Sequence, residues 1–415
     1  MRVVVLGAGL IGTTTAYFLA KAGHEVVVID RQAQAGLETS FANGALLTPS
    51  TSDSWAAPGT PQKILKWLGQ EDAPMLLRLR ALPGMIGWGL RFLRECNPKR
   101  WEANTEAVLK LALFSMAVLD KVQADERLEF DRNPQGLIKL FRDPLSMDSA
   151  LRASALYKRL GVDCTALDPD GCLAIEPALR PIREKISGGV HYPADGSGDA
   201  LKFTQALAVR AEAIGVSFLF GHEIAGFSAE GDRVAAVETD HGPVRGDSFV
   251  LALGSFSTPL GRKLGMTLPV YPAKGYSITV AAPGWNGAPR IPIADDGRKV
   301  AVVPLGDRLR VAGTVEFNGY ETSLNATRGQ MLVDGLGDIY PDYPRGGRIE
   351  HWSGLRPLTP DGRPIIGRSR WRNLFLNTGH GPLGWTLAAG SGLAMSELVS
   401  GRRTPIDLAP FALER

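Results

Sequence analysis

The sequence predicts an α/β fold in which a nucleotide-binding domain is interleaved with an α+β domain that contains an antiparallel sheet. A complete strand–helix–strand unit with a glycine-rich turn occupies the first thirty residues. The last hundred residues return to the pattern of buried strand, glycine turn and helix. Between them, residues 268–315 have the short strands and turns typical of an antiparallel sheet. With 415 residues, the chain is long enough for two domains.

The first unit is the most informative part of the chain. Residues 3–6 form a β-branched run that predicts a buried strand, and residues 11–22 have helical spacing. Residues 25–30 form a second apolar run that ends in Asp30. This is the context in which a glycine fingerprint indicates a Rossmann-like dinucleotide site, whereas a glycine turn without it is only a turn.

The fingerprint G-x-G-x-x-G is formed by Gly7, Gly9 and Gly12. Gly7 allows the tight turn, Gly9 lets a pyrophosphate approach the backbone at the helix N-terminus, and Gly12 allows close packing of helix and strand. Asp30 is placed to accept hydrogen bonds from a ribose. Its charge favours FAD or NAD over NADP, although Arg31 weakens this argument.

Further elements follow from periodicity. We expect a small antiparallel meander over 218–246 and buried strands at 249–253 and 373–377. Other expected helices cover 103–124, 146–160, 199–214, 325–337 and 385–399. The predicted nucleotide-binding domain comprises residues 1–48, 195–262 and 345–401. The second domain comprises 49–194 and 263–344, and a C-terminal tail covers 402–415.

Composition excludes several classes of function. Three scattered cysteines predict neither a disulfide framework nor a metal site. The net charge of +3 is spread out, so nucleic-acid binding is not expected. We predict a cytoplasmic protein without a spanning helix. Residues 64–93 mix apolar and basic side chains, which suits either peripheral contact with the inner face of the cell membrane or ordinary amphipathic helices.

Six stretches resemble the D-amino-acid dehydrogenase small-subunit family, within the D-amino-acid oxidase-like flavoproteins. They are ETSFAN (38–43), SWAAPG (54–59), LALGS (251–255), PVYPAKGYS (269–277), WSGLRPLTPDG (352–362) and LNTGHGPLGWT (376–386). The resemblance runs through nearly the whole chain in the same order. It implies that the nucleotide-binding domain is an FAD-binding domain and that the α+β domain is a substrate domain.

The resemblance also implies site residues. It places FAD on Gly7, Gly9, Gly12, Asp30 and Arg31, with Ile224 near the adenine, and Ala252 and Gly254 beside the pyrophosphate. It places Thr39, Ser40 and Asn43 near the isoalloxazine, and the flavin's pyrimidine end against Gly379, His380, Gly381, Gly384, Trp385 and Thr386. A helix that begins near Trp385 would offer N–H groups and a positive dipole end to negative charge on the flavin. The alternative is a glycine-rich loop that only caps the helix.

On the substrate side, the resemblance implies that Arg356 holds the substrate carboxylate, because a guanidinium can bind a carboxylate bidentately. Tyr276 is a candidate second contact and Lys274 a candidate flavin contact, although packing roles are equally open. His351 stands where the family more often has an apolar residue, so it either contacts a polar substrate group or is structural.

The resemblance implies hydride transfer from the Cα of a D-amino acid to flavin N5, with the electrons passed to a quinone or another respiratory acceptor. The resulting imine would yield a 2-oxo acid and ammonia. Narrow specificity for D-proline or cis-4-hydroxy-D-proline, and an oxygen-using oxidase, remain alternatives. So do the flavin subunit of a hetero-oligomeric dehydrogenase and a nucleotide-binding module without catalysis. A homo-oligomer is left open.

Overall fold

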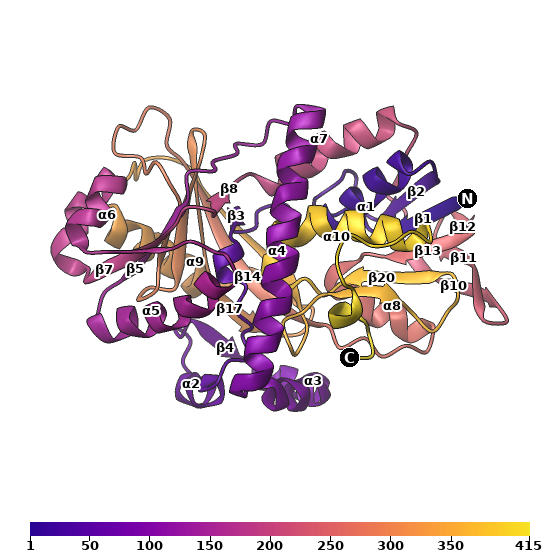
Figure 1. The fold of residues 1–415 in the computed structure, drawn as a ribbon, viewed down its shortest axis with the longest axis horizontal. Helices are drawn as coiled ribbons and strands as arrows, with labels where there is room; N and C mark the ends of the chain where they lie inside the picture. The colour runs from indigo at the N-terminus through magenta and orange to yellow at the C-terminus, as the bar shows by residue number, and fades with distance from the viewer.

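The structure is a computed structural model that describes the backbone of residues 1–415 and all side chains except that of Ala153. It contains two large sheets, and the predicted fold class is confirmed. In Figure 1 the sheet that contains the first strands of the chain, β1 and β2, and the last strand, β20, lies on the right. Strands β5 and β7 of the other sheet lie on the left. The long helix α4 runs between them.

The first sheet is the expected nucleotide-binding sheet. Its six strands have the order β19-β20-β13-β1-β2-β9, and only β19 is antiparallel to its neighbour. The β-branched residues 3–5 are fully buried, as expected for a parallel strand that is covered on both faces. The strands are β1 (Arg2–Leu6), β2 (Glu25–Asp30), β9 (Ser217–Phe220), β13 (Ser248–Leu251), β19 (Ile365–Arg368) and β20 (Leu374–Thr378).

The second sheet has nine strands and is mostly antiparallel, in the order β18-β14-β17-β16-β15-β5-β7-β6, with β4 paired to β17. Alternate residues of its strands pack into a core beneath helix α9. The strands are β4 (Met75–Leu77), β5 (Leu137–Phe141), β6 (Thr165–Leu167), β7 (Gly188–Tyr192), β14 (Tyr271–Ala281), β15 (Ile293–Asp295), β16 (Val300–Leu305), β17 (Arg308–Phe317) and β18 (Ile349–Leu358).

Three details differ from the sequence expectations. Residues 217–220 pair in parallel with β2 rather than joining the meander, which consists of β10 (Ile224–Glu230), β11 (Arg233–Thr239) and β12 (Gly242–Arg245). Strands β5, β6 and β7 were not expected. Residues 349–358, placed by sequence with the nucleotide-binding segments, form β18 of the second sheet, because they pair with β14 over ten positions.

Helices pack against both sheets and against one another. Helix α10 packs against α1 and α4, and its residues join α1 and α7 in the largest core. No helix with described side chains is long and apolar enough to cross a membrane. The helices are α1 (Leu10–Lys21), α2 (Thr60–Trp67), α3 (Leu82–Glu95), α4 (Pro98–Glu126), α5 (Pro144–Arg159), α6 (Pro169–Ile175), α7 (Ala200–Ala213), α8 (Ser257–Lys263), α9 (Ala326–Ile339) and α10 (Gly384–Val399). Small elements are β3 (Leu46–Leu47), β8 (Gly196–Ser197) and the 3₁₀ turns η1 (Pro49–Thr51), η2 (Leu79–Ala81), η3 (Pro177–Lys185), η4 (Gly254–Phe256), η5 (Gly381–Leu383) and η6 (Ala409–Phe411).

Candidate active site

One large cavity, of about 550 Å³, connects the two sheets. Its first-sheet end is lined by the turn after β1, the end of β2 and residues 222–224 and 252–263. Its second-sheet end is lined by residues of β14, β16, β17 and β18 together with residues 42–55. The loop 380–385 also lines the cavity. Segments that are far apart in the chain therefore form a single elongated site.

Each of the three fingerprint glycines is required for a different structural reason. Gly7 has a φ of +106°, and a Cβ there would lie 2.8 Å from the carbonyl oxygen of Ala252. A Cβ on Gly12 would lie 1.7 Å from the carbonyl oxygen of Gly7, so Gly12 serves packing and does not line the cavity. At Gly9 the nearest atom to such a Cβ is Ser40 Oγ at 3.6 Å. The protein thus leaves room at Gly9, where a phosphate would approach the N-terminus of α1.

Asp30 anchors the same turn. Its Oδ2 accepts a hydrogen bond from the N–H of Ala8 at 2.6 Å, and its Oδ1 accepts one from Gln32 at 2.8 Å. Burial raises the pKa of Asp30 above its ordinary value. Arg31 forms an ion pair with Glu38 at 2.6 Å and lies over the ring of Phe256. Together with Ile224, these residues line the first-sheet end.

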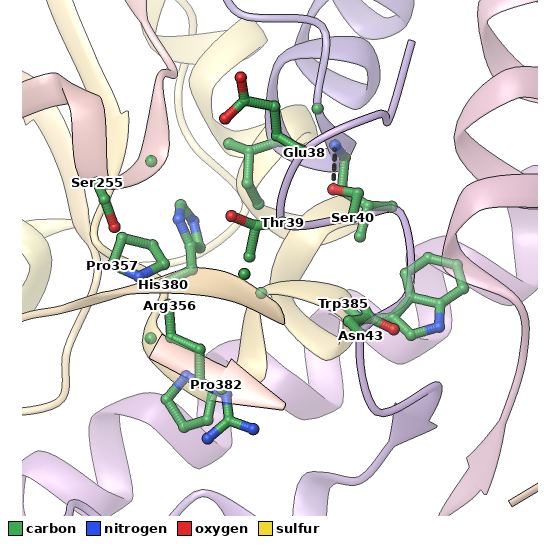
Figure 2. Close-up of a pocket in the computed structure, with 18 of the residues that line it drawn as sticks. Glu38, Thr39, Ser40, Asn43, Ser255, Arg356, Pro357, His380, Pro382 and Trp385 are labelled. Atoms are coloured by element: carbon green, nitrogen blue, oxygen red, sulfur yellow. Dashed lines mark hydrogen bonds between the residues drawn. The ribbon is translucent and has the colours of Figure 1, made fainter. Parts of the chain in front are cut away.

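The segment 39–43 runs along the middle of the cavity, and Thr39, Ser40 and Asn43 all line it (Figure 2). Thr39 donates to the carbonyl oxygen of Leu355 in β18 at 2.9 Å. Ser40 Oγ accepts from the N–H of Leu10 at 3.2 Å. The segment therefore ties the glycine turn to the second sheet.

The C-terminal loop closes another side. Gly381, Gly384 and Trp385 line the cavity, and α10 begins at Gly384 without a side-chain cap. His380 also lines it. Its Nε2 lies 3.0 Å from Ser391 Oγ, and desolvation lowers the pKa of His380 to about 3. His380 is therefore neutral at physiological pH.

Gly379 and Thr386 do not line the cavity. Gly379 has a φ of +77°, and a Cβ there would lie 2.8 Å from the Thr359 side chain. Thr386 Oγ1 accepts a hydrogen bond from the N–H of Thr48 at 3.0 Å. Gly379 and Thr386 therefore support the wall of the cavity without lining it. Ala252 and Gly254, which follow β13, do line the cavity.

Arg356 lies at the second-sheet end, on β18 (Figure 2). A Cβ on Gly275, in the adjacent strand β14, would lie 2.7 Å from its guanidinium, so this group rests on the bare backbone of that strand. Among the described side chains, no carboxylate lies within 4.0 Å of Arg356 and none donates to or accepts from it. Desolvation lowers its pKa to about 10, and it remains a cation without an anionic partner.

The other three candidates have different positions. Lys274 and Tyr276 both bind Glu316: the Lys274 Nζ lies 3.1 Å from Oε2, and the Tyr276 hydroxyl donates to the same oxygen. Lys274 is buried and does not line the cavity, while the ring of Tyr276 packs in the core under α9. His351 is exposed, and its ring lies beside Gly329 of α9. The structure does not bring Lys274 or His351 to the cavity.

Sequence reasoning missed Trp352, Ser277 and Asp53, which line the second-sheet end. The Trp352 ring lies over Gly354, where a Cβ would come within 2.2 Å of it. Residues 352, 354 and 356 alternate along β18, so the period of two in a strand was the signal that places Trp352 on the face of Arg356. Nothing comparable marks Asp53, which lies in an irregular segment.

The residues fit a dinucleotide cofactor that reaches from the first sheet to the second. The open space at Gly9 suits a pyrophosphate, since Gly9 is the N-cap of α1 and brings no side chain to its first turn. The length of the site suits a second planar group against residues 39–43 and the start of α10. Such a site, with an unpaired cation at its far end, is typical of a dinucleotide-binding protein whose second ligand is held beside the cofactor.

Comparisons identify the family. Residues 2–398 match the family DAO, FAD dependent oxidoreductase, and the chain belongs to it. It is therefore an FAD-dependent oxidoreductase. The chain is 46% identical to a D-amino acid dehydrogenase of Paramagnetospirillum magneticum, covering 100% of this chain and 99% of that protein. It is also 46% identical to a D-amino acid dehydrogenase of Dechloromonas aromatica, covering 99% of each.

Solved structures agree on the fold. Glycine oxidase from Geobacillus kaustophilus superposes with a TM-score of 0.80 at 25% identity, covering 100% of this chain and 99% of that one. L-proline dehydrogenase from P. horikoshii has a TM-score of 0.79 at 20% identity, covering 100% and 97%.

Proposed function

We propose that this FAD-dependent oxidoreductase is a D-amino acid dehydrogenase in which Arg356 holds the substrate carboxylate. The main observation that supports this proposal is the unpaired guanidinium of Arg356 at the second-sheet end of the cavity. The names of the relatives at 43–46% identity support the substrate class. A desolvated guanidinium without a partner is unfavourable unless a ligand anion pairs with it.

The residues of the chain contribute mainly by placing the substrate. The planar guanidinium fixes both carboxylate oxygens, which orients the Cα of the substrate. FAD, held by the glycine turn and by residues 39–43, would supply the redox chemistry as the acceptor of a hydride from that carbon. The start of α10 offers backbone N–H groups to negative charge, and His380 stays neutral beside it. The substrate amine must be neutral for hydride to leave, and the imine then hydrolyses to a 2-oxo acid and ammonia.

The test is anaerobic bleaching of the visible flavin spectrum by paired D- and L-amino acids. We expect D-alanine to bleach the wild-type protein and L-alanine not to. Arg356→Ala should raise the KM for D-alanine about 100-fold, as expected for losing about 3 kcal/mol of a charge-assisted bidentate contact. Arg356→Lys should recover part of this loss, and both variants should keep their FAD. A protein that D-amino acids do not bleach would refute the proposal.

Narrow specificity for D-proline or cis-4-hydroxy-D-proline is the alternative substrate range. His351 was a candidate contact to a polar substrate group such as the ring hydroxyl of hydroxyproline, and its exposed position beside α9 does not support that contact. We therefore expect acyclic D-amino acids to be used at least as well as cis-4-hydroxy-D-proline in the same bleaching assay.

We also propose that the protein attaches to the inner face of the cell membrane, from the cytoplasm, and delivers electrons to a quinone. Helices α2 and α3 lie together at the bottom of Figure 1. Of the 14 exposed large apolar side chains that the structure describes, seven lie in this region, which we call the α2–α3 face: Leu65, Leu68, Leu79, Leu82, Ile86, Leu90 and Leu93. Exposed basic residues surround them, namely Lys63, Lys66, Arg80, Arg91 and Arg94.

Co-sedimentation with anionic phospholipid vesicles tests the attachment. We expect Ile86→Glu combined with Leu90→Glu to release the protein from the vesicles, and Val209→Glu, at an exposed site on α7, to leave it bound. Comparing turnover with a soluble quinone and with oxygen tests the acceptor. Rapid reoxidation by oxygen alone would favour the oxidase alternative.

A further inference from the structure

Among the side chains that the structure describes, one positive and one negative one line the second-sheet end of the cavity. The positive one is Arg356 and the negative one is Asp53. The two other titratable side chains there are not charged: the hydroxyl of Tyr276 donates to Glu316, and His380 is neutral. The remaining charged lining residues belong to the first-sheet end: Asp30, Arg31, Glu38, Glu223 and Lys263.

Arg356 and Asp53 do not neutralise each other. No ion pair within 4.0 Å joins them, and among the described side chains neither has another ionic partner. The cavity therefore presents two separate and opposite charges. A ligand that carries both an anion and a cation complements such a site better than a ligand that carries an anion alone.

Asp53 is held in place but keeps one oxygen available. Its Oδ1 accepts a hydrogen bond from the hydroxyl of Tyr157 in α5 at 3.1 Å. Its Oδ2 has no hydrogen-bond partner among the described residues. Asp53 and Pro382 are the exposed residues among those described at this end of the cavity. The neighbouring lining residues Thr51, Trp55 and Trp352 are half-buried. Solvent therefore reaches this end of the cavity at Asp53, and we call this exposed part the mouth.

We propose that Asp53 binds the cationic end of a basic substrate side chain, so that the preferred substrates are D-amino acids such as D-lysine or D-arginine. This proposal rests on the proposed function. Arg356 takes the carboxylate, and the side chain extends past Trp352 toward the mouth.

The α-amine is not the partner of Asp53. A carboxylate beside the α-ammonium would stabilise its protonated form, which resists loss of hydride. A contact at the solvent-exposed mouth favours the far end of a long side chain, which can stay partly hydrated while it pairs with Asp53.

A binding measurement without turnover provides the first test. The probes are 6-aminohexanoate and hexanoate, which share the carboxylate and chain, and binding is followed as a perturbation of the flavin spectrum. We expect the wild-type protein to bind 6-aminohexanoate about tenfold more tightly. Asp53→Asn should abolish this preference, whereas the matched control Asp148→Asn, an exposed carboxylate on α5 outside the cavity, should retain it. Equal binding of both probes by the wild-type protein would overturn the proposal.

The kinetic test uses D-lysine and D-norleucine, which differ in the terminal ammonium. We expect the ratio of their kcat/KM values to favour D-lysine and to fall about tenfold in Asp53→Asn. Asp53→Lys should invert the preference toward D-glutamate. If D-alanine bleaches the flavin but the ratio does not change in Asp53→Asn, only the role of Asp53 is refuted. If no D-amino acid bleaches it, the proposed function and this inference both fail.

Discussion

Substitutions of single glycines distinguish positions that must be glycine for folding from positions that must be glycine for FAD binding. We predict that Gly9→Ala folds normally but loses most of its FAD, because the new methyl group has room in the protein and occupies the path of the pyrophosphate. Its unfolding free energy without FAD should stay within about 0.5 kcal/mol of the wild type. Gly12→Ala should instead unfold the turn, because its Cβ would lie 1.7 Å from the Gly7 carbonyl oxygen. Thermal denaturation and flavin content measure the two effects.

Gly275 has a comparable relation to Arg356. We predict that Gly275→Ala raises the KM for the amino acid about tenfold or more while FAD stays bound, because the Cβ would lie 2.7 Å from the guanidinium and displace it. Gly337→Ala on α9, where the nearest atom would lie 3.7 Å away, serves as the control. Unchanged kinetics in Gly275→Ala would show that the position of the guanidinium is not critical.

Asp195 should make stability depend on pH. It is buried, accepts hydrogen bonds from the N–H and hydroxyl of Ser50, and burial raises its pKa to about 7. Between about pH 4 and pH 7 the folded state keeps a proton that the unfolded state has lost, so stability falls as the pH rises through this range. The loss is at most about 4 kcal/mol. We predict that Asp195→Asn melts like the wild type at pH 5 and at a higher temperature at pH 8; parallel melting curves would refute this.

The local sequence pattern predicts that a helix or strand exists better than it predicts which side chains of that element face the site. The β1–α1–β2 unit was predictable because its periodicity, glycines and acid are adjacent in the chain. The faces of β14 and β18 were not, because their pairing joins residues about 80 positions apart. Lys274 pairs with Leu355 and Ala273 with Arg356, which puts Lys274 on the face away from the guanidinium. Selection by side-chain chemistry alone therefore chose Lys274, Tyr276 and His351, whose side chains lie on the face away from Arg356.

The same pairing creates a buried ionic cluster between elements. Glu316 of β17 binds Lys274 and Tyr276 of β14, and its Oε1 accepts from Arg78 Nε at 2.7 Å. Burial alone would raise its pKa, but the bonds from these three residues lower it to about 2. We predict that Glu316→Gln lowers the unfolding free energy by about 3 kcal/mol, because Lys274 is left buried and unpaired. Denaturant unfolding measures this, with the exposed Glu350→Gln as the control; equal stabilities would contradict it.

At the scale of the whole molecule, a part of the site was predictable where its residues are continuous in the chain, and not where distant segments come together. Most of the cofactor residues that the resemblance implies line one cavity, because each lies in a continuous motif. The mouth was not predictable, because Asp53 becomes part of it only when residues 42–55 pack against the second sheet. The site is thus a property of how the two sheets are brought together.

Because the cavity joins segments from both sheets, bound FAD should stabilise the molecule as a unit. We predict that removing FAD lowers the melting temperature, and that FAD at about 100 times its Kd restores about 2.7 kcal/mol, or about 3 °C for a chain of this length. The same addition should protect the residues 222–263 and 352–385 from proteolysis, since both segments line the cavity. Gly9→Ala should show neither effect, because its apoprotein is folded but cannot hold the pyrophosphate. A wild-type apoprotein that melts and is cleaved identically with and without FAD would show that the two sheets are held together by their own contacts alone.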